Sequence, residues 1–300
     1  MDKTQLTEIL SPSVLAKIDN YHLIARIVVE GFMSGMHRSA YHGFGTEFLQ
    51  YRNYSPGDDF KNIDWKVLGR LDRIYSKVYR EETNFNCTII LDSSASMAYK
   101  GSNSPCSKFK YATMLAASIA YLASKQGDKV GAYAYSGGIT AYLPSSNGQG
   151  HLNRLITGIS ALKPTGKALH GKNIGLIAGS IRRRGIIVLL SDFLDTDEDP
   201  ADLLKTLRAS KNDCIIVNTY DRDETSFPFK GPVRFIDSES GESILTDPEN
   251  VRTEYLSSME RHLAKIRKAC LDSQSDYLRI SSSDDLGIVL SGYLNGRGNV

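Results

Sequence analysis

Short apolar runs alternate with longer amphipathic stretches along most of the chain. After Asn84, each apolar run is followed by a stretch whose hydrophobic positions recur three and four residues apart, as on one face of a helix. A strand covered on both faces is apolar throughout, so the runs at 87–91, 186–190 and 214–219 predict buried strands. Further strands are predicted at 130–135, 139–143 and 277–280, and a hairpin is predicted to join 233–236 to 243–245.

The amphipathic stretches carry start and stop signals typical of helices. Asp199-Pro200 and Asp247-Pro248 each pair a side chain that accepts hydrogen bonds from free backbone N–H groups with a proline suited to the first turn. Gly127 is a typical terminator. Helices are predicted at 108–126, 152–162, 174–183, 200–208, 247–271 and 284–294. The alternation of strands and helices predicts an α/β fold with a mostly parallel sheet and helices on both faces.

The first 84 residues follow a different pattern. Ser11-Pro12 begins a predicted amphipathic helix that ends at Gly31 or Gly35, and its apolar stripe is expected to dock on the main domain. Glycines and prolines then punctuate a small turn-rich β segment with short strands predicted near 47–51 and 74–79. The predicted domains are therefore 1–35, 36–84 and 85–300.

Composition narrows the class of protein. Lys and Arg total 36 and Asp and Glu total 34, and this near-balance argues against a dedicated nucleic-acid binder. None of the four cysteines forms a C-x-x-C pair, so we expect reduced thiols rather than a zinc or disulfide framework. Charged residues interrupt every apolar run near the amino terminus, so no signal peptide or membrane span is expected and the protein is predicted to be cytoplasmic.

Polar residues follow two of the predicted buried strands. Asp92, Ser94 and Ser96 form a D-x-S-x-S pattern after 87–91, and Asp192 follows 186–190. Ligands of doubly wound sheets bind outside the carboxyl ends of the strands, so these side chains are expected to meet. Carboxylates and hydroxyls form a hard oxygen set that suits Mg²⁺ or Mn²⁺. The alternative is that Asp92 only caps a helix or forms a turn.

The stretch Ile89–Met97 resembles the metal-ion-dependent adhesion site of von Willebrand factor A domains. The resemblance implies that Asp92, Ser94 and Ser96 line a metal, that a threonine on a second loop joins them, and that Asp192 is the aspartate of a third loop. Thr165 fits the second loop, although the family usually has two glycines before that threonine. If Gly166 instead matches the glycine that precedes the threonine, Lys167 falls at the threonine position and would weaken cation binding.

An upstream pattern resembles a bacterial family called domain of unknown function 58. Its hallmark, R-x-Y-x-P-G-D followed by I-D-W, matches Arg52–Asp58 and Ile63–Trp65, and the resemblance covers roughly 30 to 297. Trp65 is expected to be a buried anchor of an ion-paired layer packed on the main domain. The alternative is that this layer is a docking surface for a partner.

Other motifs are weaker. Residues 166–173 nearly match a phosphate-binding loop, but the match ends in Asn173 and no apolar strand precedes it. Arg182 to Arg184 fall at a predicted helix end, where cations favour the helix dipole, so a solvated cap is favoured over a phosphate patch. The histidines are scattered and give no support to histidine catalysis.

The resemblance implies a non-catalytic, metal-dependent protein-interaction module. In related domains an acidic side chain of a partner fills an open position on the metal, and members of the second family are associated with MoxR-type AAA+ ATPases. We therefore expect an adaptor that is not an enzyme. Two alternatives stay open. One is a metal-dependent phosphoesterase, which needs a second metal or a general base near Asp92 and for which only Asp195 and Asp197 are spare carboxylates nearby; the other is a structural domain with a degenerate metal site.

Overall fold

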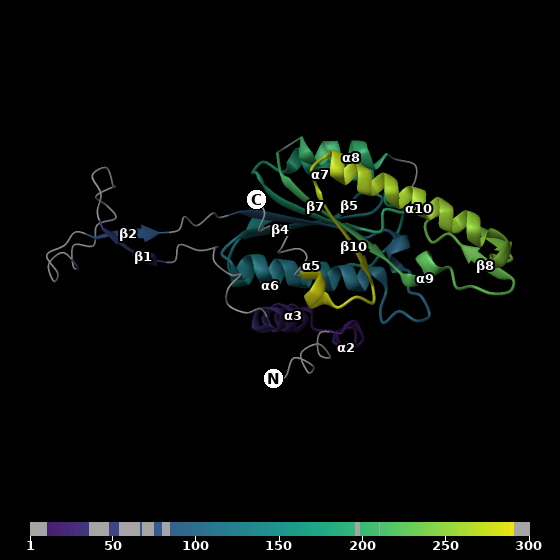
Figure 1. Ribbon diagram of the computed structural model, residues 1–300, viewed down its shortest axis with the longest axis horizontal. Helices are drawn as coiled ribbons and strands as arrows, with labels where there is room; N and C mark the ends of the chain where they lie inside the picture. Colours follow the sequence, from purple (N-terminus) through teal and green to yellow (C-terminus); the bar gives the residue numbers. More distant parts are fainter. Residues whose placement is uncertain are drawn as a thin grey trace. The chain divides into compact units, whose positions relative to one another are not determined.

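The computed structural model describes residues 11–35, 48–53, 67, 75–79, 85–195, 199–209 and 211–290 (Figure 1). The chain divides into two compact units, one made of 1–36 with 85–300 and the other of 37–84. In the smaller unit, β1 (Phe48–Asn53) pairs antiparallel with β2 (Tyr75–Tyr79), which confirms the two strands predicted there. Most of the hallmark, including Trp65, lies outside the described residues, so its predicted burial stays a prediction.

Within the described residues, six strands of the larger unit form one sheet in the order β10-β7-β6-β3-β4-β5. The strands are β3 (Asn86–Asp92), β4 (Lys129–Tyr135), β5 (Ile139–Ser146), β6 (Gly185–Ser191), β7 (Asp213–Tyr220) and β10 (Asp276–Ser281). All neighbours are parallel except β4 and β5, so β5 is an antiparallel edge strand. The order reverses between β3 and β6, and this switch point is where open α/β sheets bind ligands.

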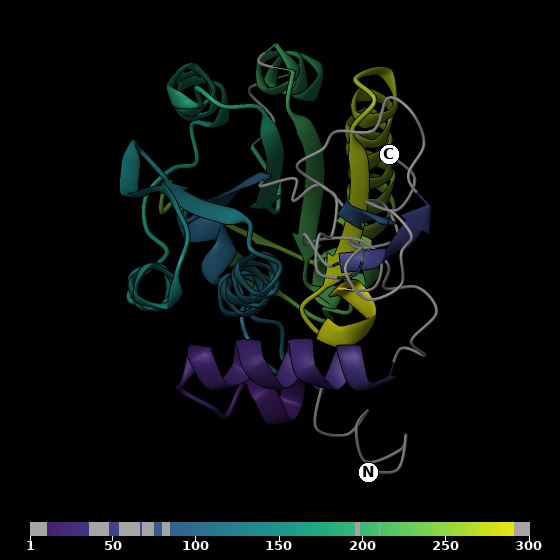
Figure 2. The same cartoon turned by 90° about the vertical axis from the view of Figure 1, so that its left-hand side faces the viewer.

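Helices cover both faces of this sheet (Figure 2). The helices are α5 (Lys108–Lys125), α6 (Gln149–Ser160), α7 (His170–Ser180), α8 (Pro200–Arg208), α9 (Arg222–Ser226) and α10 (Pro248–Asp272), with helical residues also at 286–290. Ile89 and Leu91 of β3 enter one core with α5 and α6, while Ile90 enters a second core with α7, α8 and α10. The alternation follows from the two-residue period of a strand. The predicted α/β fold is confirmed.

The predicted single amino-terminal helix is wrong, because two helices occupy this region. They are α2 (Pro12–Leu15) and α3 (Tyr21–Gly35). Asn20 accepts a hydrogen bond from the backbone N–H of Leu23 at 3.0 Å and so starts a new helix, a role for which asparagine is well suited. The predicted docking is confirmed, since Ile24 and Val28 are fully buried and α3 lies against α5 as an outer layer (Figures 1 and 2).

Other boundaries differ more modestly from the predicted ones. Helix α7 ends at Ser180, three residues before the predicted end, and the short α9 was not predicted. The predicted hairpin is confirmed as β8 (Val233–Ile236) paired with β9 (Ser243–Thr246). No helix among the described residues is long and apolar enough to cross a membrane.

Candidate functional site

Asp92 ends β3 at the switch point of the sheet and is fully buried. Its Oδ1 accepts a hydrogen bond from the backbone N–H of Ser94 at 2.8 Å, and its Oδ2 accepts one from Ser191 Oγ, on β6, at 2.6 Å. These two donors fix the carboxylate between the two strands. The hydrogen bond from Ser94 N also turns the chain sharply after the strand, because an aspartate side chain commonly accepts from the backbone N–H two residues later.

Ser94 and Ser96 stand on the turn that follows. Ser94 has an extended backbone just before the 3₁₀ helix η2 (Ala95–Ala98), and its hydroxyl oxygen lies 2.9 Å from that of Ser96. Ser96 is half-buried, and its side chain lies close enough to Asp192 to help lower the pKa of that carboxyl. The D-x-S-x-S residues are therefore brought together with Asp192, as the sequence predicted they would meet.

The second loop lies directly against this turn. The backbone N–H of Thr165 donates to the carbonyl of Ser93 at 2.8 Å, and that of Ala95 donates to the carbonyl of Gly166 at 2.9 Å. Gly166 has a φ of +74°, a conformation for which glycine is suited. Thr165 is thus next to the D-x-S-x-S turn, while its role as a ligand stays a prediction. Lys167 is exposed, and its charge adds to the hydrogen bonds from Ser240 and Glu239 that lower the pKa of Asp237 between β8 and β9.

Lys108 is a component that the sequence did not reveal. This fully buried lysine at the start of α5 donates to Asp192 Oδ2 at 2.8 Å and also forms an ion pair with Glu224. Burial acts to lower the pKa of Lys108, but the charges of Asp192 and Glu224 outweigh it and raise that pKa. The one available signal was a lysine at the first helical position, where a cation opposes the helix dipole.

Glu224 belongs to a second acidic cluster after β7. Asp221 accepts a hydrogen bond from Asp223 N, and Glu224 accepts one from Asp221 N at 2.8 Å, a reciprocal capping box that starts α9. Asp221 Oδ2 also accepts a hydrogen bond from Gly101 N at 2.8 Å. A D-x-x-E pattern directly after a predicted strand could have indicated this helix start.

The two carboxylates differ in their electrostatic surroundings. Burial raises the pKa of Asp92, His170 acts against that shift, and the nearby charge of Asp192 adds to it. Burial also acts to raise the pKa of Asp192, but the charge and hydrogen bond of Lys108 and the backbone N–H of Leu194 together outweigh it and lower that pKa. No lysine or arginine within the described part of the chain is at ion-pair distance from Asp92.

The donor set fits a small, hard divalent cation. It consists of two carboxylates and two serine hydroxyls, which are oxygen donors of the kind that Mg²⁺ and Mn²⁺ take. The described residues contain no cluster of three or more His, Cys, Asp or Glu that could hold a metal, so a cation here would depend on the hydroxyls. A cation would also compensate the buried charge of Asp92, whereas Lys108 already compensates Asp192.

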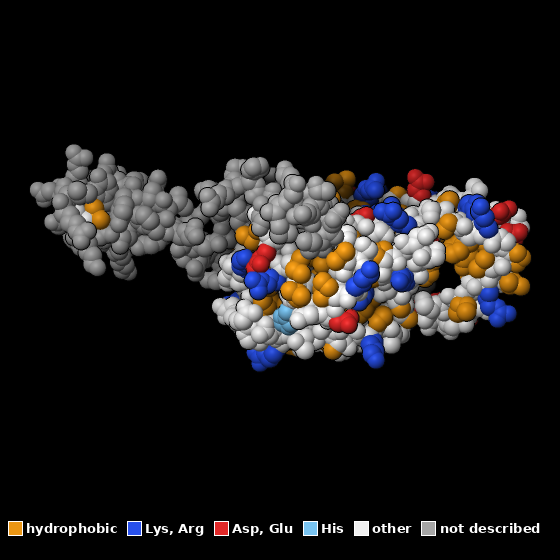
Figure 3. All heavy atoms as spheres, turned by 90° about the horizontal axis from the view of Figure 1, so that it is seen from below, with side chains coloured by type: hydrophobic (Ala, Val, Ile, Leu, Met, Phe, Trp, Pro, Cys, Tyr) orange, Lys and Arg blue, Asp and Glu red, His pale blue; other side chains and the backbone are white. Residues whose placement is uncertain are grey.

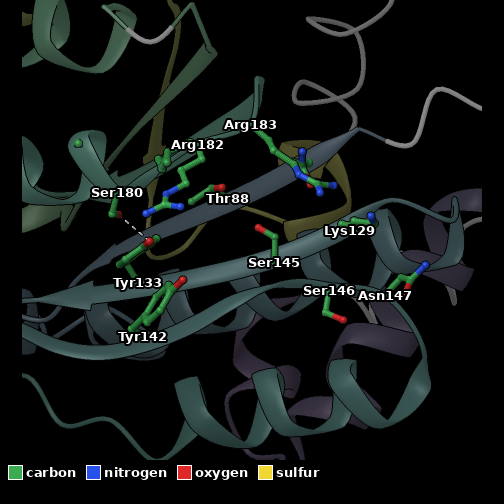
Figure 4. A pocket seen from close by; sticks show the side chains of 13 residues that line it. Thr88, Lys129, Tyr133, Tyr142, Ser145, Ser146, Asn147, Ser180, Arg182 and Arg183 are labelled. Carbon is green, nitrogen blue, oxygen red and sulfur yellow. Dashed lines mark hydrogen bonds between the residues drawn. The ribbon is translucent and has the colours of Figure 1, made fainter.

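A separate groove of about 720 Å³ lies at the opposite edge of the sheet (Figure 4). Figure 4 shows Lys129, Arg182 and Arg183 along it, with Tyr133 hydrogen-bonded to Ser180 at 2.7 Å. Because α7 ends at Ser180, Arg182 and Arg183 follow the helix and line this groove, which corrects the predicted helix cap. The groove touches none of the residues around Asp92 and lies at the amino ends of β3 and β4, so we assign the candidate site to the other edge.

Comparison with known proteins agrees with the fold and the hallmark. The family model described as "Protein of unknown function DUF58" matches residues 50–265. The uncharacterized protein Rv1480 of Mycobacterium tuberculosis is 25% identical over 285 residues, which cover 93% of this chain and 88% of that protein.

Solved structures were compared as well. An aerotolerance-related membrane protein from Bacteroides fragilis is similar with a TM-score of 0.51 at 18% identity, covering 72% of this chain and all of that one. The VWA domain of SpRpn10 is similar with a TM-score of 0.43 at 14% identity, covering 69% and 94%. The chain therefore belongs to the DUF58 family of proteins of unknown function, and its larger unit has an α/β fold with a mostly parallel sheet.

Proposed function

We propose that this chain is a non-catalytic protein-interaction module that binds an acidic side chain of a partner through a divalent cation. The observation that carries the proposal is the meeting of Asp92, Ser94, Ser96 and Asp192 at the switch point, where Asp92 is buried and no described lysine or arginine is at ion-pair distance from it. Asp92, Ser94 and Ser96 would hold Mg²⁺ or Mn²⁺, with Asp192 and Thr165 completing the set. When bound, such an ion supplies an exchangeable position that an anionic oxygen can fill.

The hydrogen bonds around Asp192 support binding rather than water activation. Activating water requires a base that can accept a proton beside the metal. Asp192 already accepts a hydrogen bond on each oxygen, from Lys108 on Oδ2 and from the backbone N–H of Leu194 on Oδ1. Asp195, one of the spare carboxylates expected from the sequence, also has its own interactions, and Asp197 lies outside the described residues.

The surface beside the site supports a protein as the ligand. Three large hydrophobic side chains of the β8–β9 hairpin, Ile236, Ile244 and Leu245, are each more than 60% exposed. Figure 3 shows hydrophobic side chains gathered at the end where Figure 1 labels β8. Exposed apolar groups rimmed by polar residues are typical of protein contact sites. The family resemblance makes a MoxR-type AAA+ ATPase in the cytoplasm the first partner to test.

The test is capture of a purified MoxR-type ATPase on the immobilised full-length chain, in Mg²⁺ and in chelator. We expect capture in Mg²⁺ that chelator abolishes, and loss of capture by Asp92→Ala. Asp202→Ala removes an exposed carboxylate on α8 and serves as the matched control that leaves capture unchanged. Phosphoester hydrolysis should stay at background throughout. Capture that persists in chelator, or turnover that Asp92→Ala eliminates, would overturn the proposal.

A further inference from the structure

The groove at the amino ends of β3 and β4 is lined by charges of one sign. Lys129 begins β4, while Arg182 and Arg183 follow the end of α7, and all three side chains line the groove (Figure 4). The described residues that line it include no aspartate or glutamate. None of the three cations forms an ion pair within the described part of the chain. The groove is therefore positively charged and suited to an anion.

An aromatic surface lies along the same groove. Tyr133 of β4 and Tyr142 of β5 are paired across the antiparallel strands, and their rings stack with centroids 4.6 Å apart at an interplanar angle of 26°. Tyr133 is buried, whereas Tyr142 is 56% exposed. Tyr142 therefore presents an exposed aromatic ring that rests on a buried one, an arrangement on which a flat ring of a ligand can stack.

The buried ring is held in place by hydrogen bonds. The Ser180 hydroxyl donates to the carbonyl of Ile177 at 2.7 Å, so its single hydrogen is used within α7. The contact of 2.7 Å between the Tyr133 hydroxyl and Ser180 Oγ is therefore donated by the tyrosine. The aromatic surface is thus fixed relative to the end of α7, from which Arg182 follows.

The aromatic and cationic parts of the groove are separated along β4. Tyr133 and Lys129 are four residues apart on this strand and so lie on the same face, about 13 Å from each other. Figure 4 shows the two tyrosine rings toward one end of the groove, and Lys129 with Arg183 toward the other. The volume of about 720 Å³ is in the range of small-molecule sites. A ligand that uses both ends must therefore be longer than a single phosphate ion.

A buried polar atom of the groove also lacks a partner. Asn86 lines the groove where β3 begins, and its Oδ1 is buried but accepts no hydrogen bond within the described part of the chain. An unpaired buried acceptor costs free energy, and native proteins rarely leave one without a partner. The atom therefore favours a ligand that carries a hydrogen-bond donor, such as a hydroxyl group.

We propose that this groove binds a nucleotide, a ligand that combines phosphate groups, a hydroxylated sugar and an aromatic base. Lys129, Arg182 and Arg183 would hold the phosphates through charge-assisted hydrogen bonds. The base would stack on Tyr142, and a sugar hydroxyl would donate to Asn86 Oδ1. An inorganic anion would engage only the cations. The groove and the candidate site around Asp92 lie at opposite edges of the sheet, so this inference does not depend on a cation at that site.

Isothermal titration calorimetry of the full chain with ADP, GDP and UDP, in buffer without divalent cations, tests the inference. We expect at least one of them to bind with a dissociation constant below about 1 mM. Its free nucleoside and pyrophosphate should each bind at least about tenfold more weakly, because each carries only part of the ligand.

Variants place the binding in the groove. Arg182→Ala should weaken binding of that nucleotide at least about tenfold, because it removes a charge-assisted hydrogen bond. Tyr142→Ala should weaken it at least about fivefold, whereas Tyr142→Phe keeps the ring and should bind like the wild type. Arg184→Ala is the matched control, since this neighbouring arginine is exposed but is not among the residues that line the groove.

Three results would overturn the inference. The first is a dissociation constant above about 1 mM for all three nucleoside diphosphates. The second is pyrophosphate that binds as tightly as the nucleotide, since an anion alone would then account for the groove. The third is equal weakening by Arg182→Ala and Arg184→Ala, which would indicate attraction to surface charge in general. Thermal unfolding checks the fold, and both arginine variants should unfold at the wild-type temperature because both side chains are exposed.

Discussion

Lys108 shows how a single buried charge shapes this site. Its ammonium group is fully buried and its counter-charges, Asp192 and Glu224, are almost fully buried as well. The pKa of Lys108 is raised, so its contribution to stability is complete below the unfolded value and is lost only as pH rises through the folded value. The pKa of Asp192 is lowered, so its contribution is present above its unfolded value and is lost as pH falls through the folded one. The Lys108–Asp192 pair is therefore intact at neutral pH.

Lys108→Met should lower the free energy of unfolding by about 3–5 kcal/mol at pH 7, because it leaves two carboxylates buried without a partner. Urea denaturation at fixed pH measures this directly. Lys205→Met is the matched control, since Lys205 and its partner Asp202 are largely exposed and such pairs contribute less than about 1 kcal/mol. A loss of under about 1 kcal/mol in Lys108→Met would show that the ion pair is not structural.

Helix α3 packs on the main unit through the apolar stripe that its sequence predicts. Its buried stripe of Ile24, Ala25, Val28 and Val29 packs on α5, whose Lys110 also donates to the carbonyl of Ala16 at 2.7 Å. The helix therefore belongs to the main unit rather than standing apart from it.

Ile24→Ala should cost about 2–5 kcal/mol of unfolding free energy, since it removes a fully buried side chain from this contact. Leu23→Ala removes a neighbouring side chain that is 44% exposed and should cost less than about 0.5 kcal/mol. Chemical denaturation measures both variants. An equal loss of unfolding free energy in the two, or no loss in either, would mean that α3 does not depend on this packing.

The features that could be predicted from the sequence depend on residues that lie close together along the chain. The apolar run before Asp92 indicates a buried strand, and the short spacing from Asp92 to Ser96 predicts that these residues share a turn. The second-loop contact of Thr165 depends on backbone bonds to Ser93, which no local pattern encodes. The same holds for Lys108, which meets Asp192 only after α5 packs on the sheet.

At the scale of the whole molecule, the doubly wound order of the sheet assembles the site. Reversal of the strand order between β3 and β6 brings Asp92 and Asp192 to one edge of the sheet, and the loop after α6 lies against the turn that follows Asp92. The chain as a whole is nearly neutral, with a formal charge of +2, so the acidic character of this site is local. A cation bound there would be attracted by the carboxylates of the site and not by the net charge of the protein.

The central claim is that the site at the carboxyl ends of β3 and β6 binds a divalent cation through Asp92. Thermal unfolding of the wild type and of Asp92→Asn, with and without Mg²⁺, tests it most directly. At ten times its dissociation constant, Mg²⁺ should stabilise the wild type by about 1.4 kcal/mol and leave Asp92→Asn unchanged. In chelator, Asp92→Asn should be at least as stable as the wild type, because burial raises the pKa of Asp92 and the charged form is therefore disfavoured. An equal Mg²⁺ shift in both proteins, or no shift in either, would contradict the account.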